Sequence, residues 1–392
     1  MLFAIGFVIV LTIALDPHRN YLNDPLASAE VVARQAAILG IFALGAGIVI
    51  IAGGIDLSSG SVIALSGAIC ASIIYALVPV NDAGNPITKD IPLWITGTAI
   101  LGTIVVALMV GSLHAWLITV IRLPPFVATL ASLVGLRSLA RVIVQDATAT
   151  FDQNSNTQIY IRDETFRNLA QVWWVPVLIF FVITFILWMI MTKTVTGRHL
   201  YAIGGNEEAA RLSGIRTEKL KWLAYCIGAV TASIAGMLYS AYTGASAPAQ
   251  DGVGYELNAI ASSVVGGCAL TGGLGSIPGI MLGALFLRIV IDSVSKTVPN
   301  NPDDFEGLVV GILVVLAVAF NELRGGSKRD GKQLLPGALG TVNLVVLPVL
   351  IGSISGLMRE ENKLVTALIV AAVTFAVLFV RRTFDNRRLR KR

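Results

Sequence analysis

Charged side chains are scarce in this sequence. They make up 14% of its 392 residues, whereas hydrophobic side chains make up 55%; an ordinary soluble domain carries about 25% charged residues. The hydrophobic residues form continuous runs near the length of a bilayer span, about 20 residues. The composition therefore excludes a soluble globular domain and predicts an all-α, polytopic membrane bundle with lipid as its main solvent.

Cysteine and histidine are equally sparse. The three cysteines lie inside hydrophobic runs without metal-ligand or secreted-type spacing, which predicts buried free thiols: Cys70, Cys226 and Cys268. The three histidines have no paired ligand or nucleophile nearby: His18, His114 and His199. We predict no catalytic residue and no metal site. The net charge of +5 comes from residues between or after the hydrophobic runs, which fits orientation in a membrane rather than a nucleic-acid partner.

The segment 326–332, GSKRDGK, imitates a phosphate-binding loop. Gln333 stands where Ser or Thr would reach Mg²⁺, and the segment follows a hydrophobic run instead of a strand. We therefore expect this chain to bind no cofactor and to leave ATP hydrolysis to another subunit.

The hydrophobic runs predict about ten spans or broken helices up to residue 323 and about two more beyond it. They are 2–15, 36–53, 60–79, 92–119, 124–144, 172–192, 221–243, 256–273, 274–292, 305–321, 340–358 and 364–380. The run 256–273 is rich in Gly and Ser, so a broken or re-entrant helix is expected there. The first run lacks a basic flank and a cleavage site, which indicates a retained span.

Basic residues gather in three segments, at 193–221, at 324–332 and at 381–392. The predicted spans place all three on one side of the membrane, which the positive-inside rule identifies as the cytoplasm, together with both termini. The chain then divides into four parts: a membrane domain at 1–323, a cytoplasmic basic loop at 324–339, an extra transmembrane hairpin at 340–380 and a polybasic cytoplasmic tail at 381–392.

Three glycines, an acid and three serines interrupt the hydrophobic run between 36 and 80. The interruption, GGIDLSSGS, predicts a broken helix or a tight turn, and its acid is costly in hydrocarbon unless it is paired or hydrated. Either the acid or the first serine caps the next helix, or the break lines a solvated translocation path, and both can hold. The candidate path residues are Asp56, Ser58 and Ser61, and the structural glycines are Gly53 and Gly54.

Two further segments carry polar groups into the spans. The run Leu123–Val144 begins with two prolines and places Arg137 and Arg141 on one face, where they either extend to the interface or hydrogen-bond into a polar cavity. The segment Gly254–Gly279, GYELNAIASSVVGGCALTGGLGSIPG, indicates either close packing or a path-lining or gating role. Its candidate path residues are Asn258, Ser262 and Ser263, and its structural glycines are Gly266, Gly267, Gly272 and Gly273.

A charged, glycine-punctuated loop, Thr196–Ile215, lies between two long hydrophobic runs. Its sequence, TGRHLYAIGGNEEAARLSGI, predicts a helix of about two turns: Asn206 can cap it, Arg211 lies four residues beyond Glu207, and Gly214 can end it. A helix this short is not stable alone in water. We therefore expect a soluble partner to dock against it.

Together these four motifs resemble the membrane permease subunit of bacterial ABC importers of the ribose, xylose and galactose type, a group related to branched-chain amino acid permeases. The resemblance covers about residues 30–323. The sequence departs from the family pattern at Ser59, where valine is usual, at Ala131 and Ser138, where glycine is usual, and at Asn258, where aspartate is usual. The extension 324–392 exceeds the usual member; it could pack outside the bundle, or its tail could touch anionic lipid or the ATPase.

The resemblance implies that 1–323 is a permease domain in the bacterial inner membrane and carries a monosaccharide, with a nucleoside or a branched-chain amino acid as alternative cargo. Two such subunits, expected to be a homodimer, would form the path; two ATP-binding cassette subunits would use ATP and Mg²⁺ in the cytoplasm; and a solute-binding protein would dock outside. The regions around Asp56, Phe126 and Asn258 would lie near the path. Ala209 and Leu212 would form the apolar docking face of the ATPase-coupling segment. That segment comprises Gly204, Gly205, Asn206, Glu207, Glu208, Ala209, Ala210, Arg211, Leu212 and Gly214.

The rival hypothesis is a secondary transporter driven by an ion gradient. It requires buried acids with polar partners along the spans. Such acids are few and lie near predicted span ends: Asp56, Glu256 and Asp292. The sequence therefore favours a non-catalytic subunit of an ATP-driven importer.

Overall fold

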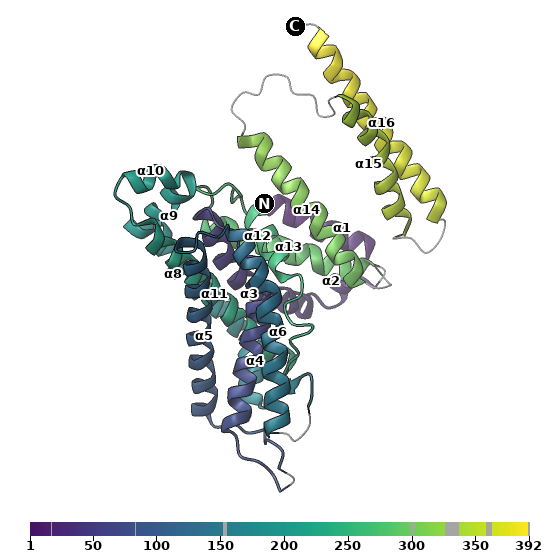
Figure 1. The fold of residues 1–392 in the computed structure, drawn as a ribbon. Coiled ribbons are helices and arrows are strands. Elements are labelled where there is room, and N and C mark those ends of the chain that lie inside the picture. The colour runs from purple at the N-terminus through teal and green to yellow at the C-terminus, as the bar shows by residue number, and fades with distance from the viewer. Residues whose placement is uncertain are drawn as a thin grey trace. The chain divides into compact units, whose positions relative to one another are not determined.

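The computed structural model describes residues 1–16, 18–82, 84–151, 155–298, 302–325, 337–357 and 363–390. The chain forms two compact units, Met1–Asn321 and Glu322–Arg392. In chain order the elements are α1 (Leu2–Leu15), α2 (Asn20–Asn23), α3 (Pro25–Ile51), α4 (Ser59–Leu77), α5 (Leu93–Thr119), α6 (Pro125–Phe151), β1 (Ile159–Tyr160), α7 (Glu164–Gln171), α8 (Trp174–Lys193), α9 (Val195–Gly205), α10 (Glu207–Leu212), α11 (Thr217–Thr243), β2 (Ala245–Ser246), α12 (Tyr255–Val265), α13 (Ile277–Thr297), α14 (Pro302–Gly325), α15 (Gly337–Leu357) and α16 (Lys363–Arg390) (Figure 1).

The prediction of an all-α membrane bundle is confirmed. Eight helices in the described ranges are long and apolar enough to cross a bilayer: α3, α4, α5, α6, α8, α11, α13 and the part of α16 up to Val380. Three further apolar segments are shorter: Leu2–Leu15, Phe305–Leu316 and Val342–Ser353. Full-length spans are thus fewer than the hydrophobic runs suggested, because several runs form short or broken helices.

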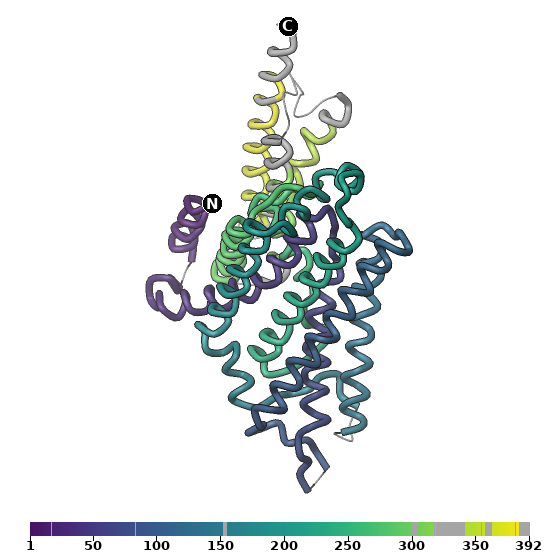
Figure 2. Tube along the Cα trace, turned by 90° about the vertical axis from the view of Figure 1, so that its left-hand side faces the viewer, coloured from purple at the N-terminus to yellow at the C-terminus, as the bar shows by residue number. Residues whose placement is uncertain are grey.

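Helix α3 is the centre of the first unit. Every residue from Ala36 to Ile51 is buried, and α3 packs against α8, α11, α12 and α13. Its glycines permit this: a Cβ added at Gly45 would lie 1.9 Å from Thr231 Oγ1 of α11. By contrast only 22–33% of the residues in the most apolar parts of α5, α6 and α8 are buried, as expected of lipid-facing helices. Figure 2 shows the long helices between residues 59 and 151 running side by side.

Two helix breaks interrupt this bundle at the predicted places. After α3 the backbone is not helical until Ser59, and Gly53 takes the left-handed conformation with φ +81°. Helix α12 ends at Val265 after 11 residues, and Gly267 follows with φ +97°. Eleven residues cover about 16 Å, roughly half of a hydrocarbon core. The run 256–273 is therefore a broken helix and not a continuous span.

Strands β1 and β2, with the adjoining loop residues as far as Asp163 and Asp251, cover one end of the first unit, and we call them the loop cap. Strand β1 pairs antiparallel with β2, with Ile159 opposite Ser246. The Ile91 N–H donates to the Asp163 carboxylate at 2.9 Å and ties a third loop to the cap. Helix α11 begins just after α10 and ends beside β2. Its 27 residues, at about 1.5 Å per residue, therefore separate the loop cap from α10 by roughly 40 Å.

The second unit contains the antiparallel pair α15 and α16. A Cβ at Gly352 would lie 2.4 Å from the Ala367 carbonyl, and a Cβ at Gly356 would lie 2.5 Å from the Lys363 carbonyl. The two glycines therefore allow the helices to touch through their backbones. Most of the predicted basic loop, at 326–336, including the phosphate-loop-like segment, lies outside the described residues, as does the end of the tail at 391–392.

Candidate functional site

The predicted short helix exists as α10, and its start is capped as expected. The Asn206 side chain accepts a hydrogen bond from the Ala209 N–H at 2.9 Å. The Arg211 guanidinium bonds both carboxylate oxygens of Glu208 at 2.8 Å, three residues away, and not Glu207, four residues away. Glu207 instead pairs with Lys221 of α11 at 2.6 Å. That cross-helix contact takes Glu207 away from Arg211 and fastens α10 to the start of α11.

The end of α10 is a glycine cap. Gly214 has φ +82°, and its N–H donates to the Arg211 carbonyl at 3.0 Å. The Ile215 N–H donates to the Ala210 carbonyl at 3.1 Å. This pair of bonds is the Schellman arrangement, which satisfies carbonyls that the helix end leaves free. The prediction that Gly214 ends the helix is confirmed, and α10 is held at both ends despite its length.

The two faces of α10 differ in exposure. Ala210 is buried, whereas Ala209 is exposed and Leu212 is 81% exposed. An apolar side chain this exposed, at the tip of a helical hairpin, does not stabilise the fold through burial. This is the geometry that a docking face requires, because its burial would contribute only when a partner covers it.

The chain immediately before α10 enters a contact that we call the glycine junction, formed by Gly53, Gly204, Gly205, Gly272 and Gly273. A Cβ at Gly204 would lie 1.8 Å from the Ile51 carbonyl oxygen and 2.4 Å from the Gly273 nitrogen. The Gly273 N–H donates to the Ile51 carbonyl at 2.9 Å. Three segments therefore meet backbone to backbone, namely the end of α3, the end of α9 and the loop between α12 and α13.

Neighbouring contacts extend this junction. Gly272 and Gly273 both have positive φ, +86° and +73°. The Tyr201 hydroxyl of α9 donates to the Gly275 carbonyl at 3.0 Å. Gly266 lies against α13, where its Cβ would come within 2.5 Å of the Gly279 carbonyl. Both helix breaks are thus in direct contact with the base of the α9–α10 hairpin or with the loop that touches it.

The candidate path residues do not gather in one place. Asp56 is 4% exposed, and its carboxylate accepts from the Ser58 N–H, at 2.9 Å, and from the Ser58 hydroxyl. The Ser61 hydroxyl donates to the Ser58 carbonyl at 2.6 Å. Ser58 occupies the N-cap position of α4, although its side chain makes no capping bond. The acid therefore bonds within the turn ahead of α4, and the interpretation that Asp56 or Ser58 caps this helix is wrong, because neither side chain accepts from an amide of its first turn.

The other candidates lie apart from this turn. Ser262 and Ser263 are fully buried; Ser263 donates to the Ala43 carbonyl of α3 at 3.1 Å, which is close helix packing. Phe126 is half exposed near the start of α6. Arg137 donates to the Pro248 and Asp251 carbonyls at 3.0 and 2.7 Å. The structure thus decides for Arg137 in favour of inward hydrogen bonding, here to the loop cap.

Asp251 is the buried acid of the loop cap. Its carboxylate accepts from the Ala247 N–H at 2.7 Å, and it is 5% exposed. Burial raises the pKa of Asp251 to about 6, opposed by that hydrogen bond and by the positive charge of Arg137.

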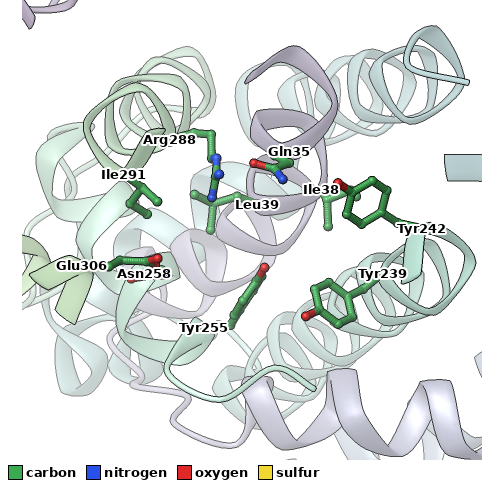
Figure 3. A pocket seen from close by; sticks show the side chains of 10 residues that line it. All are labelled: Gln35, Ile38, Leu39, Tyr239, Tyr242, Tyr255, Asn258, Arg288, Ile291 and Glu306. Carbon is green, nitrogen blue, oxygen red and sulfur yellow. Dashed lines mark hydrogen bonds between the residues drawn. The ribbon is translucent and has the colours of Figure 1, made fainter. Parts of the chain in front are cut away.

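A pocket that no motif predicted lies between five helices of the first unit (Figure 3). It is partly open, and its volume is about 100 Å³. The residues that line it are Gln35, Ile38 and Leu39 of α3, Tyr239 and Tyr242 of α11, Tyr255 and Asn258 of α12, Arg288 and Ile291 of α13, and Glu306 of α14. Among the candidate path residues, Asn258 alone lines it. The sequence signal for this pocket is Arg288, a cation inside a hydrophobic run.

The apolar helices and the two interrupted segments define the class of this protein as a multi-pass membrane protein with irregular backbone inside its bundle. Residues 28–318 match the family described as branched-chain amino acid transport system / permease component. The match covers most of the chain, and the chain belongs to this family.

Curated relatives include permeases named for sugars. The chain is similar to the ribose import permease protein RbsC of Escherichia coli (strain K12), with 30% identity over 317 residues, 81% of this chain and 91% of the relative. It is similar to the xylose transport system permease protein XylH of Haemophilus influenzae, with 41% identity over 143 residues, 36% and 37% of the two chains. It is also similar to the fructose import permease protein FruG of Bifidobacterium longum, with 32% identity over 227 residues, 56% and 66%. No solved structure matches the chain.

Proposed function

We propose that this chain is the membrane permease subunit of an ATP-driven importer and forms the path of a monosaccharide that an external solute-binding protein delivers. Family membership and the relatives named for ribose, xylose and fructose support this role. The single observation that carries it is α10, a helix capped at both ends whose Leu212 is 81% exposed.

In this proposal a second copy of this chain completes the path. The α10 helices of the two copies bind two ATP-binding cassette subunits, which hold the ATP and Mg²⁺. Basic residues flank α10 in the sequence, including Arg198, Arg216 and Lys219. The positive-inside rule then favours a cytoplasmic position for α10 and both termini. The loop cap, at the other end of α11, would face the solute-binding protein.

The glycine junction gives α10 a route to the bundle. Closure of the ATPase dimer would displace the α9–α10 hairpin, and the backbone contact of Gly204 with Ile51 and Gly273 would pass this displacement to both helix breaks. Because no flexible side chain separates these backbones, the three segments would move together. Such a shift between two packings is the element that alternating access requires.

Two of the three acids give the rival ion-driven mechanism no support, whereas Glu256 has a buried Oε2 without a hydrogen-bond partner among the described residues. Asp56 bonds the turn that follows it, and Asp292 pairs with Lys296 at 2.7 Å and accepts from the Tyr21 hydroxyl. An acid that relays ions needs to exchange partners along a path, and these two are engaged by residues of their own surroundings. Competition by nucleosides and branched-chain amino acids for uptake would test the alternative cargoes.

The test of α10 removes its exposed charges. Glu207, Glu208 and Arg211 are replaced by Ala together, the chain is co-expressed with the ATPase and solute-binding subunits, and co-purified ATPase and sugar uptake are measured. Exposed ion pairs stabilise a fold by only about 0–1 kcal/mol, so expression should persist while co-purification and uptake fall. A matched control for ATPase co-purification removes two acids and one base from the opposite end: Asp82, Lys89 and Glu164. Wild-type co-purification and uptake in the α10 variant would refute the coupling role.

A further inference from the structure

We propose that the pocket between α3, α11, α12, α13 and α14 binds one edge of a monosaccharide inside a single copy of the chain. The proposal rests on the import function above and assigns a binding site to it. A volume of about 100 Å³ equals about three water molecules at roughly 30 Å³ each. The pocket is partly open, so it can enclose a few hydroxyl-bearing carbons while the rest of the ring extends outward.

Unpaired polar atoms indicate that the pocket takes a ligand. Gln35 Oε1 and Arg288 Nε are buried without a hydrogen-bond partner among the described residues. Buried polar atoms are nearly always paired, with protein, water or a ligand. The two atoms require opposite hydrogen-bond partners, because the carbonyl oxygen requires a donor and the guanidinium N–H requires an acceptor. A hydroxyl group supplies both.

The remaining lining has no excess charge that would favour a ligand of one sign. Arg288 and Glu306 carry opposite charges, and Asn258 Nδ2 donates to Glu306 Oε1 at 3.4 Å. Figure 3 shows the Arg288 guanidinium and the Gln35 amide on one side of the pocket and the Tyr255 ring across from them. Tyr255 meets Tyr239 nearly at right angles, with ring centroids 5.7 Å apart. Aromatic surface with a few fixed polar groups suits a neutral, polyhydroxylated ring, whose C–H face is apolar.

The position of the pocket fits a solute that enters from outside. Tyr239 lies about six turns along α11 from its start beside α10, roughly 33 Å at 1.5 Å per residue. The pocket is therefore close to the loop-cap end of the bundle. Since all its walls belong to one chain, each permease copy would hold its own sugar-binding pocket.

The experiment measures equilibrium sugar binding to the complex of this chain with its ATPase partners in lipid nanodiscs, without the solute-binding protein. The probes are radiolabelled D-ribose, D-xylose and D-fructose, with L-leucine as the competing zwitterionic ligand. Gln35→Met removes the unpaired carbonyl at similar volume, and Arg288→Lys keeps the charge but removes the planar donors. Gln145→Met, on the exposed surface of α6, is the matched control.

We expect Gln35→Met to weaken sugar binding about three- to tenfold, the effect of one lost hydrogen bond to an uncharged group. Its Tm without sugar should be no lower than wild type, because the unpaired oxygen is gone, while the sugar-induced rise in Tm should shrink. Equal sugar affinity in both pocket variants and the control would overturn the proposal, as would binding of leucine in place of sugar. ATP-driven uptake that is the same in wild type and Gln35→Met would refute the pocket and leave the import function intact. Absence of uptake by the wild-type complex would instead refute the import function.

Discussion

Gly204→Ala tests whether the glycine junction carries movement from α10 into the bundle. The new methyl carbon would lie 1.8 Å from the Ile51 carbonyl oxygen and 2.4 Å from the Gly273 nitrogen. Real Cβ contacts essentially never fall below 3.0 Å, and both neighbours are backbone atoms that cannot rotate away. The segments must therefore part by about 1 Å, and the hydrogen bond from Gly273 to Ile51 lies in the same gap.

Two effects set the energetic cost of this parting, the overpacking itself and the weakening of that hydrogen bond. Overpacking costs about 1–3 kcal/mol, and one backbone hydrogen bond contributes about 0.5–1.5 kcal/mol. We expect Gly204→Ala to lower the free energy of unfolding by about 2–4 kcal/mol. We also expect it to separate ATP hydrolysis from transport, because α10 and its exposed face remain in place while its contact with the helix breaks is disturbed.

The assay compares sugar uptake and ATP hydrolysis in proteoliposomes that contain the complete complex. Residues along a coupling route change coupling energies by about 0.5–2 kcal/mol, so Gly204→Ala should transport about two- to thirtyfold fewer sugar molecules per ATP. Gly205→Ala is the matched control, because its added Cβ meets nothing within 4 Å. Wild-type stoichiometry in Gly204→Ala, or equal damage by both substitutions, would refute transmission through the junction.

Three further predictions concern the ends of the same unit. Leu212→Ala should weaken ATPase binding by the lost burial of most of a leucine side chain, about 1.5–3 kcal/mol, measured as affinity for the isolated ATPase, whereas Leu101→Ala on the lipid-facing surface of α5 should leave it unchanged. Asn206→Ala should lower uptake by removing a cap that contributes about 1 kcal/mol to α10, and Asn206→Asp should restore it, since aspartate caps equally well; failure of this rescue would show that the cap is not the cause. Asp251 has a folded-state pKa of about 6 against an ordinary 3.8. Below pH 3.8 the Asp251 carboxyl is protonated in both states and does not change the free energy of unfolding. Above pH 6 its burial lowers the free energy of unfolding by about 3 kcal/mol. Between pH 5 and pH 7.5 the Tm of wild type should therefore fall more than that of Asp251→Asn, and parallel Tm curves would contradict this.

The sequence predicted the features that local patterns determine. The hydrophobic runs indicated the bundle, and glycine with polar residues indicated both breaks, because backbone geometry there depends on a few adjacent residues. The caps of α10 were predictable for the same reason: Asn206 and Gly214 act on groups within five residues of themselves. The partner of Arg211 was not predictable, since Lys221 of another helix takes Glu207.

Features that join distant segments escaped prediction. Each glycine of the junction stood out in the sequence, but nothing local indicates that Gly53, Gly204 and Gly272 touch. Arg137 allowed two interpretations, and only the position of the loop cap, with its carbonyls at Pro248 and Asp251, decides between them. The pocket draws one to three residues from each of five helices, so no motif marks it. Its lining follows from helix packing alone.

Sugar uptake by proteoliposomes under two energy sources tests most directly whether this chain is the permease subunit of an ATP-driven importer. One set of proteoliposomes contains this chain with its ATPase partners and the solute-binding protein, and ATP is supplied on the side of the membrane that the ATPase subunits face. The other set contains the chain alone under a sodium or proton gradient. We predict monosaccharide uptake that depends on ATP and on the ATPase subunits, with none driven by the ion gradient. Gradient-driven uptake by the chain alone, or ATP-independent uptake by the complex, would contradict this prediction.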